Sequence, residues 1–186
     1  MAISLDNFYT GKLVKLTAPK EGDAKAMAKW QEDTAYLRNV DTDIAFPRSE
    51  ASLISREQGG SSSSVFEFRI RPADGEALLG FAAIFGIEWN NRTGTMAIGI
   101  GEKSNRGKGY AKESLQLLLR FAFHECSLNR IGLDVISYNE AAINLYKKAG
   151  FHEEGRMRQA VLRNGGAYDR IMMGMLREEW EAMLPD

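Results

Sequence analysis

A glycine-rich turn that joins an apolar strand to an amphipathic helix constrains this chain more than any other feature. The turn is Gly107-Lys108-Gly109, and the helix predicted after it covers residues 109–124. Two glycines let a backbone approach an anion closely, and the free amides and dipole of a helix's first turn favour a phosphate there. The sequence therefore predicts a phosphate-binding loop, to which Arg106 and Lys108 would add positive charge.

Two well-known nucleotide loops do not fit this turn. A Walker-type loop requires Ser or Thr after its Gly-Lys pair, whereas Gly109 follows Lys108 here. The dinucleotide fingerprint requires a third glycine at position 112, which is Lys112. A glycine-rich turn that binds no ligand remains the alternative to a phosphate loop.

A second helix, predicted over residues 140–149, carries a polar pattern on one face. Asn139 is placed to cap this helix. Asn139, Ala142 and Tyr146 share a face because they are three and four residues apart. The small alanine leaves room for a narrow ligand to pass. In the alternative interpretation, Asn139 only caps the helix and Tyr146 only packs against the sheet.

The two motifs together resemble the acyl-coenzyme-A-binding motifs of the GNAT N-acetyltransferase superfamily. The turn resembles Arg/Gln-x-x-Gly-x-Gly/Ala, with Ser104 in its first position. The helix resembles Asn-x-x-Ala-x-x-x-Tyr-x-x-x-Gly-Phe and ends at Gly150-Phe151. The hairpin at 88–92 and the end of the chain resemble the branch with ribosomal-protein N-terminal and spermidine acetyltransferases.

The resemblance implies a reaction, an acyl donor and roles for individual residues. The acetyl group of acetyl-CoA would pass to a primary amine by direct attack in a ternary complex, the acceptor being a protein N-terminus or a small amine. Tyr146 would donate a proton to the departing thiolate, and the backbone at 98–100 would bind pantetheine and polarise the thioester. The residues expected to contact the cofactor are Ile98, Gly99, Ile100, Arg106, Gly107, Lys108, Gly109, Tyr110, Ala111, Asn139 and Asn144.

The general base is less well defined than the cofactor site. A base is needed because primary amines are mostly protonated near neutral pH. Related enzymes often carry a glutamate on the strand before the phosphate loop, but residues 93–97 contain no acid. Glu88 is the leading catalytic candidate, with Glu102 and Asp134 behind it. A water relay would remove the need for any of them, and Glu88 would then be a solvated charge beside a turn.

The order of predicted elements indicates an α+β fold of GNAT type, a single domain over residues 1–186. It would contain a mixed, mostly antiparallel sheet of about seven strands flanked by about four helices. Strands are predicted over residues 12–17, 65–71, 78–89, 93–101, 131–136, 151–162 and 167–176, and helices over 21–32, 49–58, 109–124 and 140–149, with a short amphipathic tail at 177–183. Residues 59–64, rich in glycine and serine, are expected to form a surface loop.

The acceptor pocket is expected among residues 30–58, the hairpin at 88–92 and the hairpin at 159–169. The acidic residues of the first region could attract a cationic amine; they are Asp33, Asp41, Asp43 and Glu50. A solvated acidic loop is the alternative.

Composition excludes several other classes of protein. The chain has a net charge of -1 and 44% hydrophobic residues, which is typical of a globular protein and gives no sign of nucleic-acid binding. No eighteen-residue apolar run and no signal peptide are seen, so no membrane association is expected. Cys126 is the only cysteine, which favours a cytoplasmic location. With only two histidines, no metal site is expected.

Two function classes remain after these exclusions. The first is the acetyltransferase; the second is a non-catalytic acyl-CoA-binding sensor with the same fold. Tyr146 favours the enzyme because binding alone needs no proton donor, whereas the missing acid at residues 93–97 favours the sensor. The resemblance would also imply a homodimer, by family habit.

Overall fold

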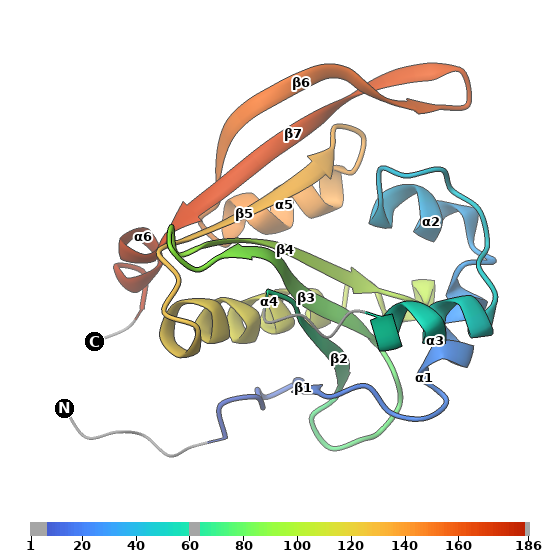
Figure 1. The fold of residues 1–186 in the computed structure, drawn as a ribbon, viewed down its shortest axis with the longest axis horizontal. Helices are drawn as coiled ribbons and strands as arrows, with labels where there is room; N and C mark the ends of the chain where they lie inside the picture. Colours follow the sequence, from blue (N-terminus) through green and yellow to red (C-terminus); the bar gives the residue numbers. More distant parts are fainter. Residues whose placement is uncertain (1–6, 60–63, 185–186) are drawn as a thin grey trace.

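The centre of the computed structural model, which describes residues 7–59 and 64–184, is a seven-stranded sheet (Figure 1). The strands lie in the order β1-β2-β3-β4-β5-β7-β6, and β4 and β5 are parallel while the other neighbours are antiparallel. They are β1 Val14–Thr17, β2 Phe66–Pro72, β3 Gly80–Glu88, β4 Thr93–Ile100, β5 Arg130–Ile136, β6 His152–Arg163 and β7 Gly166–Leu176. The predicted mixed, mostly antiparallel α+β sheet is confirmed.

The β6–β7 hairpin follows directly from local sequence. Its turn contains Asn164 and Gly165, whose φ angles are 52° and 73°. Both values lie in the left-handed region that two-residue hairpin turns require and that asparagine and glycine tolerate best. Along β7, Ile171, Met173 and Met175 are buried at every second position, as expected for a strand with one face on the core.

Six α-helices flank the sheet within the described ranges, two more than predicted. They are α1 Asp23–Trp30, α2 Thr34–Val40, α3 Glu50–Gly59, α4 Tyr110–Arg120, α5 Glu140–Lys148 and α6 Arg177–Glu181. The tail predicted over 177–183 forms α6, whereas α2 was not predicted at all. Helices as short as α2 are not stable alone, and this one relies on tertiary contacts: Tyr36 is buried, with its ring 6.0 Å from that of Trp30.

Helix α4 carries the inward apolar stripe that was predicted for residues 109–124. Leu115 and Leu118 are buried, and the helix packs on β1, β3 and β4. Regular α-helix ends at Arg120 rather than near His124, because a π-helical turn follows, in which the Cys126 amide donates to the Phe121 carbonyl at 2.9 Å.

Helix α1 is anchored to the sheet by a buried ion pair. The carboxylate oxygens of Asp23 accept hydrogen bonds of 2.7 Å from Arg71 on β2. Most of the loop predicted over residues 59–64 lies outside the described residues. Among the helices that the structure describes, none combines the length and the apolar character needed to cross a bilayer.

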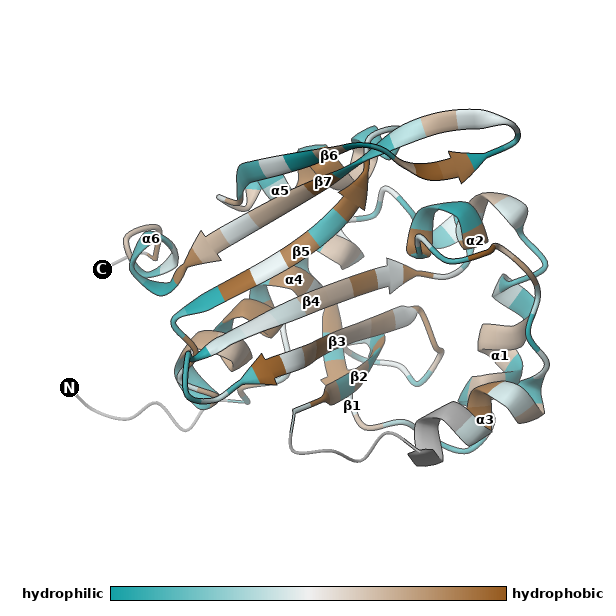
Figure 2. Ribbon diagram, turned by 45° about the horizontal axis from the view of Figure 1, so that its top comes forward, coloured by the Kyte–Doolittle hydropathy of each residue, from teal (hydrophilic) through white to brown (hydrophobic). Residues whose placement is uncertain are grey.

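Strands β4 and β5 pair only at their beginnings. Residues Thr93–Thr95 lie opposite Arg130–Gly132, and beyond this point the two strands diverge (Figure 2). Helix α2 faces the opening, close to α1 and α3 at the same end of the sheet (Figures 1 and 2). The divergence creates a gap in the middle of the sheet, and the candidate site is built around this gap.

Candidate active site

The divergence of β4 from β5 leaves backbone groups of β4 facing an open space. The amide of Gly101 donates to the carbonyl of Leu79 at 2.9 Å, which fixes which residues face β3. Because backbone groups alternate along a strand, the N–H and C=O groups of Ile98 and Ile100 face the gap. Such an edge can bind an extended molecule as an added strand. This is the geometry predicted for residues 98–100.

A cavity of about 630 Å³ opens beside this edge. It lies between the end of β4, the glycine-rich loop, α2 and α5. It brings together every residue predicted to contact the cofactor except Lys108, namely Ile98, Gly99, Ile100, Arg106, Gly107, Gly109, Tyr110, Ala111, Asn139 and Asn144. We call it the cofactor cavity.

The glycine-rich loop has the geometry of an anion site. Gly107 and Gly109 have φ angles of 75° and 86°, a region that glycine enters without strain. A methyl group on Gly107 would meet no atom within 4 Å, so the space in front of it is open. Among the described residues, the amides of 107–112 have no hydrogen-bond acceptor. These residues fit a phosphate group, which would supply the missing acceptors at the helix N-terminus.

From the sequence, Arg106 was expected to be a free cation at the rim of this cavity. It does line the cavity, but its guanidinium is already paired. Its guanidinium donates to the Gly101 carbonyl at 2.8 Å and to the carboxylate of Asp33 at 3.3 Å. Asp33 also accepts the amide of Ala35 at 2.8 Å and thereby caps α2. Desolvation opposes ionisation of Asp33, but the backbone amides and the Arg106 charge outweigh it and hold its pKa below the usual value.

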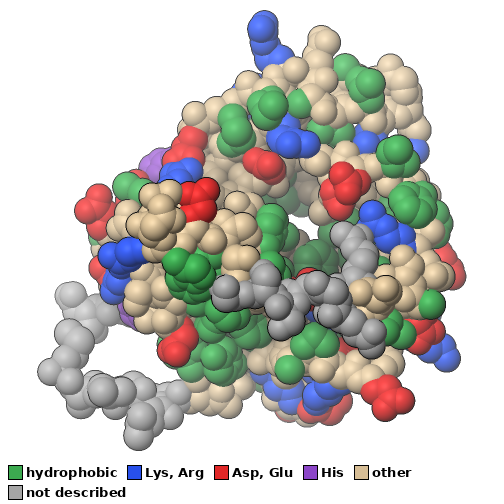
Figure 3. All heavy atoms as spheres, viewed as in Figure 1, with side chains coloured by type: hydrophobic (Ala, Val, Ile, Leu, Met, Phe, Trp, Pro, Cys, Tyr) green, Lys and Arg blue, Asp and Glu red, His purple; other side chains and the backbone are tan. Residues whose placement is uncertain are grey.

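A second cavity, of about 610 Å³, lies on the other side of the gap; a hollow with hydrophobic walls is visible in Figure 3. We call it the acceptor cavity. Residues from α2 and the loop after it form one wall, β2 to β5 form another, and α1, α3 and α5 complete the lining. Its acidic lining residues are Asp41, Asp43, Glu67 and Asp134.

Only part of the region predicted for the acceptor pocket lines this cavity. Residues from the 30–58 region do line the acceptor cavity, including Asp41 and Asp43. The hairpins at 88–92 and 159–169 do not line it. Asp33 and Glu50 are also absent from its lining, because Asp33 caps α2 and Glu50 is the first residue of α3.

The two cavities meet at Tyr146. The residues that line both are Tyr36, Asn39, Val40, Ile98, Asn139, Ala142 and Tyr146. Tyr146 is only 7% exposed, and burial raises the pKa of its hydroxyl to about 12. The hydroxyl is therefore protonated at neutral pH. The shared face of Asn139, Ala142 and Tyr146 stands where the sequence predicted it.

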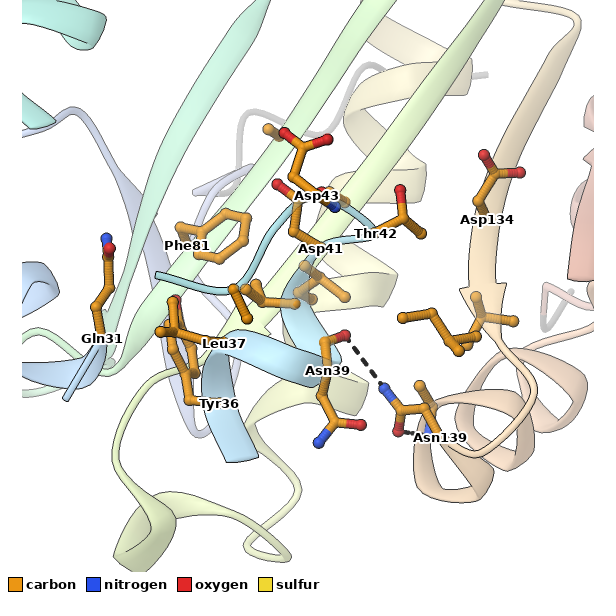
Figure 4. Close-up of a pocket in the computed structure, with 18 of the residues that line it drawn as sticks. Gln31, Tyr36, Leu37, Asn39, Asp41, Thr42, Asp43, Phe81, Asp134 and Asn139 are labelled. Atoms are coloured by element: carbon orange, nitrogen blue, oxygen red, sulfur yellow. Dashed lines mark hydrogen bonds between the residues drawn. The ribbon is translucent and has the colours of Figure 1, made fainter. Parts of the chain in front are cut away.

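Asn139 joins α5 to α2 across the gap (Figure 4). Its side-chain oxygen accepts the amide of Ala142 at 3.2 Å, which is the predicted helix cap. Its side-chain nitrogen donates to the carbonyl of Asn39 at 3.4 Å. Three of the junction residues, including Asn39, belong to α2 and were not singled out from the sequence. The one local signal for α2 was Asp33, a residue type that caps helices, followed by a short run of apolar and polar residues.

Glu88 is not brought to the site. It lies opposite Thr93, at the end of β4 where β4 and β5 are still paired, and it accepts a hydrogen bond of 2.5 Å from Asn91. It lines neither cavity. Strands rise about 3.3 Å per residue, so the five residues from Thr93 to Ile98, which lines both cavities, place Glu88 roughly 16 Å from their junction. The leading catalytic candidate from the sequence therefore lies outside the lining of both cavities.

Of the other two acids, Asp134 lines the acceptor cavity and Glu102 does not. Asp134 lies on the part of β5 that has left β4, with Arg170 at 3.9 Å. Glu102 is exposed beside Lys29. In the described part of the chain, no three His, Cys, Asp or Glu side chains gather in a way that could hold a metal ion.

Comparison with known proteins assigns the chain to a family. Residues 14–152 match the family model described as "Acetyltransferase (GNAT) domain". The chain is 31% identical over 174 residues to the "SPbeta prophage-derived uncharacterized N-acetyltransferase YokL" of Bacillus subtilis, covering 94% of this chain and 96% of that protein. It is 29% identical over 103 residues to a spermidine N(1)-acetyltransferase of Vibrio cholerae, covering 55% and 59% of the two chains.

The fold agrees with this assignment. A crystal structure of spermidine N-acetyltransferase from Vibrio cholerae, in complex with CoA and spermine, superposes with a TM-score of 0.83 at 22% identity, covering 92% of this chain and 99% of that one. The family model spans most of the sequence and includes both motifs around the gap. The chain therefore belongs to the GNAT family and is an N-acetyltransferase.

Proposed function

We propose that this N-acetyltransferase transfers the acetyl group of acetyl-CoA to a primary amine by direct attack within a ternary complex. The observation that carries the proposal is the junction of the two cavities at Tyr146. A donor and an acceptor that enter from opposite sides of the gap would meet there in one orientation, which removes much of the entropic cost of a bimolecular reaction.

Two segments of the chain bind the two parts of acetyl-CoA. The free amides that follow Gly107 hold the pyrophosphate, and the backbone groups of Ile98 and Ile100 hold the pantetheine arm. Acetyl-CoA supplies the activated acetyl group and a thiol as the leaving group. The fit of loop, strand edge and cavity to an elongated phosphate ester supports this assignment.

Tyr146 acts where negative charge develops on the leaving group. Its pKa of about 12 lies well above the roughly 8.5 of an ordinary thiol. The hydroxyl therefore holds its own proton and stabilises the departing sulfur by donating a hydrogen bond. Because it is buried where the two cavities meet, little water competes for that bond.

We assign deprotonation of the acceptor amine to Asp134, directly or through a water molecule. Of the three carboxylates considered from the sequence, this one lines the acceptor cavity. Its neighbours Asp41 and Asp43 add negative charge that favours a cationic amine over a neutral or anionic acceptor. The spermidine N(1)-acetyltransferase among the relatives is named for an acceptor of this kind.

The test is thiol release from acetyl-CoA across a panel of amines. The panel contains spermidine, an aminoglycoside, free amino acids and peptides with ribosomal-protein-like N-termini, plus a reaction without acceptor. Thiol release that requires one acceptor class is the expected result. If acetyl-CoA raises the melting temperature but no amine releases thiol, the ternary-complex proposal is overturned in favour of a sensor that only binds acyl-CoA.

A further inference from the structure

The loop between α2 and α3 forms part of the acceptor cavity but has little structure of its own. Asp41, Thr42 and Asp43 line the cavity. Within residues 41–48 of the described chain there is no backbone-to-backbone hydrogen bond. The amide of Asp43 donates to the Asp41 carboxylate at 2.9 Å, which shapes the turn without attaching it to anything else. The position of this loop must therefore be set by contacts from outside it.

At the far end of the loop, the Arg48 amide donates to the Gln31 side chain at 2.9 Å. Two arginines of the β6–β7 hairpin supply the contacts to residues 41–43. One terminal nitrogen of Arg163 donates to the backbone carbonyls of Asp41 and Asp43, at 3.1 and 2.7 Å. A terminal nitrogen of Arg170 donates to the Thr42 hydroxyl at 2.9 Å. Residues 41, 42 and 43 of the loop are thus each bonded to the hairpin, which itself does not line the cavity.

The hairpin is a firm support for this loop. Arg170 lies on β7 between Ile136 of β5 and Met157 of β6, so its backbone is paired on both sides. Arg163 lies opposite Gly166, next to the hairpin turn. The same turn also contacts α2, because Asn164 accepts a hydrogen bond of 2.6 Å from Arg38.

We propose that Arg163 is a positioning residue for the acceptor amine: it holds the loop of residues 41–43 so that the carboxylates of Asp41 and Asp43 face the acceptor cavity. The proposal rests on the function proposed above and deepens it. Arg163 bonds to backbone carbonyls and so occupies neither carboxylate, and the Asp43 amide takes one oxygen of Asp41. In Figure 4, Asp43 and Asp134 point to the same side of the cavity from the loop and from β5.

The test compares three variants on the same hairpin. Arg163→Met removes the donors and keeps much of the side chain's length, and Arg163→Lys keeps the charge but not the planar array of donors. Arg158→Met, on the exposed part of β6, is the matched control because it removes the same charge away from the loop. Arg163→Met should raise the KM for the amine about tenfold, with kcat and the Kd for acetyl-CoA changed by less than about twofold.

Arg163→Lys should lie between wild type and Arg163→Met, and Arg158→Met should equal wild type. An unchanged amine KM in Arg163→Met would overturn the proposal. So would a matching loss of acetyl-CoA affinity, because that would indicate a general structural role for Arg163.

A readout without turnover separates this proposal from the proposed function. Thermolysin cuts before large apolar residues, and Ile44 and Phe46 in the loop are exposed. Cleavage there should be several times faster in Arg163→Met than in wild type or Arg158→Met, because the loop is released. A wild-type protein that binds acetyl-CoA but acetylates no amine counts against the proposed function. In that case equal cleavage rates would still show that Arg163 does not hold the loop.

Discussion

The carboxylate of Asp33 and the guanidinium of Arg106 form an ion pair of 3.3 Å that joins the N-terminus of α2 to the glycine-rich loop. The loop borders the cofactor cavity, and α2 lines both cavities. One ion pair thus connects the part of the chain that faces a phosphate to the helix that faces the acceptor.

Asp33→Asn should weaken the binding of both substrates slightly. Asparagine keeps the cap on α2 and loses only the charge that pairs with Arg106. Because the pair is about one third exposed, its contribution is about 1 kcal/mol or less. The Kd for acetyl-CoA and the KM for the amine should therefore each rise a few fold. Glu102→Gln, which removes an exposed charge beside the same loop, should change neither value. Unaltered binding in Asp33→Asn would show that the pair does not connect the two cavities.

Tyr146→Phe should lower kcat by about a hundredfold, the usual cost of losing one hydrogen bond to charge in a transition state. The Kd for acetyl-CoA, measured by calorimetry, should stay within about twofold because the ring remains in place. Tyr168→Phe removes a hydroxyl from a residue that lines neither cavity and should behave as wild type. Full activity in Tyr146→Phe would contradict the assigned role.

Asp134→Asn and Glu88→Gln distinguish the two candidate bases. Asp134 lines the acceptor cavity, whereas Glu88 lines neither cavity and lies opposite Thr93, five residues before Ile98. Asp134→Asn should lower kcat/KM by about a hundredfold or more at neutral pH and recover part of that loss at high pH, where more of the amine is unprotonated. Glu88→Gln should keep its activity. The reverse pattern in pH-rate profiles would restore Glu88 as the base.

Gly107→Ala should weaken acetyl-CoA binding beyond its effect on stability. The added methyl group meets no atom of the protein, but it enters the open space in front of the loop. The φ angle of 75° adds a strain of about 1 to 2 kcal/mol. Gly22→Ala is the matched control, because Gly22 has a φ of 88° and open space around it but lines neither cavity. Both variants should lose similar stability in urea unfolding, and Gly107→Ala alone should lose about tenfold in acetyl-CoA affinity. Equal affinities in the two variants would argue against a phosphate at this loop.

Two buried tyrosines should make the protein less stable at high pH. Burial raises the pKa of Tyr36 and Tyr146 to about 12, against about 10 in an unfolded chain. Below pH 10 both are protonated in either state, so their contribution is complete. As the pH rises from about 10 to about 12, the unfolded chain releases protons that the folded chain keeps, and the free energy of unfolding falls. Absorbance at 295 nm should show these phenols ionising late, and Tyr146→Phe should remove part of that late change. If Tyr146→Phe leaves the late change intact, Tyr146 is not protected as the structure implies.

Features that depend on neighbouring residues could be predicted from the sequence. Asn139 caps α5 through an amide three residues away, and the turn at Asn164 follows from which residues tolerate a positive φ. The amides after Gly107 have no acceptor in the described part of the chain because a helix start follows two glycines. These features arise from interactions between residues close in sequence, so their sequence motifs are enough to predict them.

Features that depend on strand pairing could not be predicted. Glu88 and Asp134 are both single acids on apolar strands, and only the divergence of β4 from β5 decides which one reaches a cavity. Helix α2 is too short to be evident from its sequence, and its position depends on contacts with Trp30 and with the hairpin.

The sequence by itself determined the glycine-rich loop and the Asn139 cap of the cofactor cavity, because the geometry of a loop and of two helix starts is local. Only the tertiary structure decided how the loop of residues 41–43 is held beside the acceptor cavity. Arg163 and Asp41 are 122 positions apart in the chain, and no local pattern records a contact that exists only after the hairpin has folded beside α2.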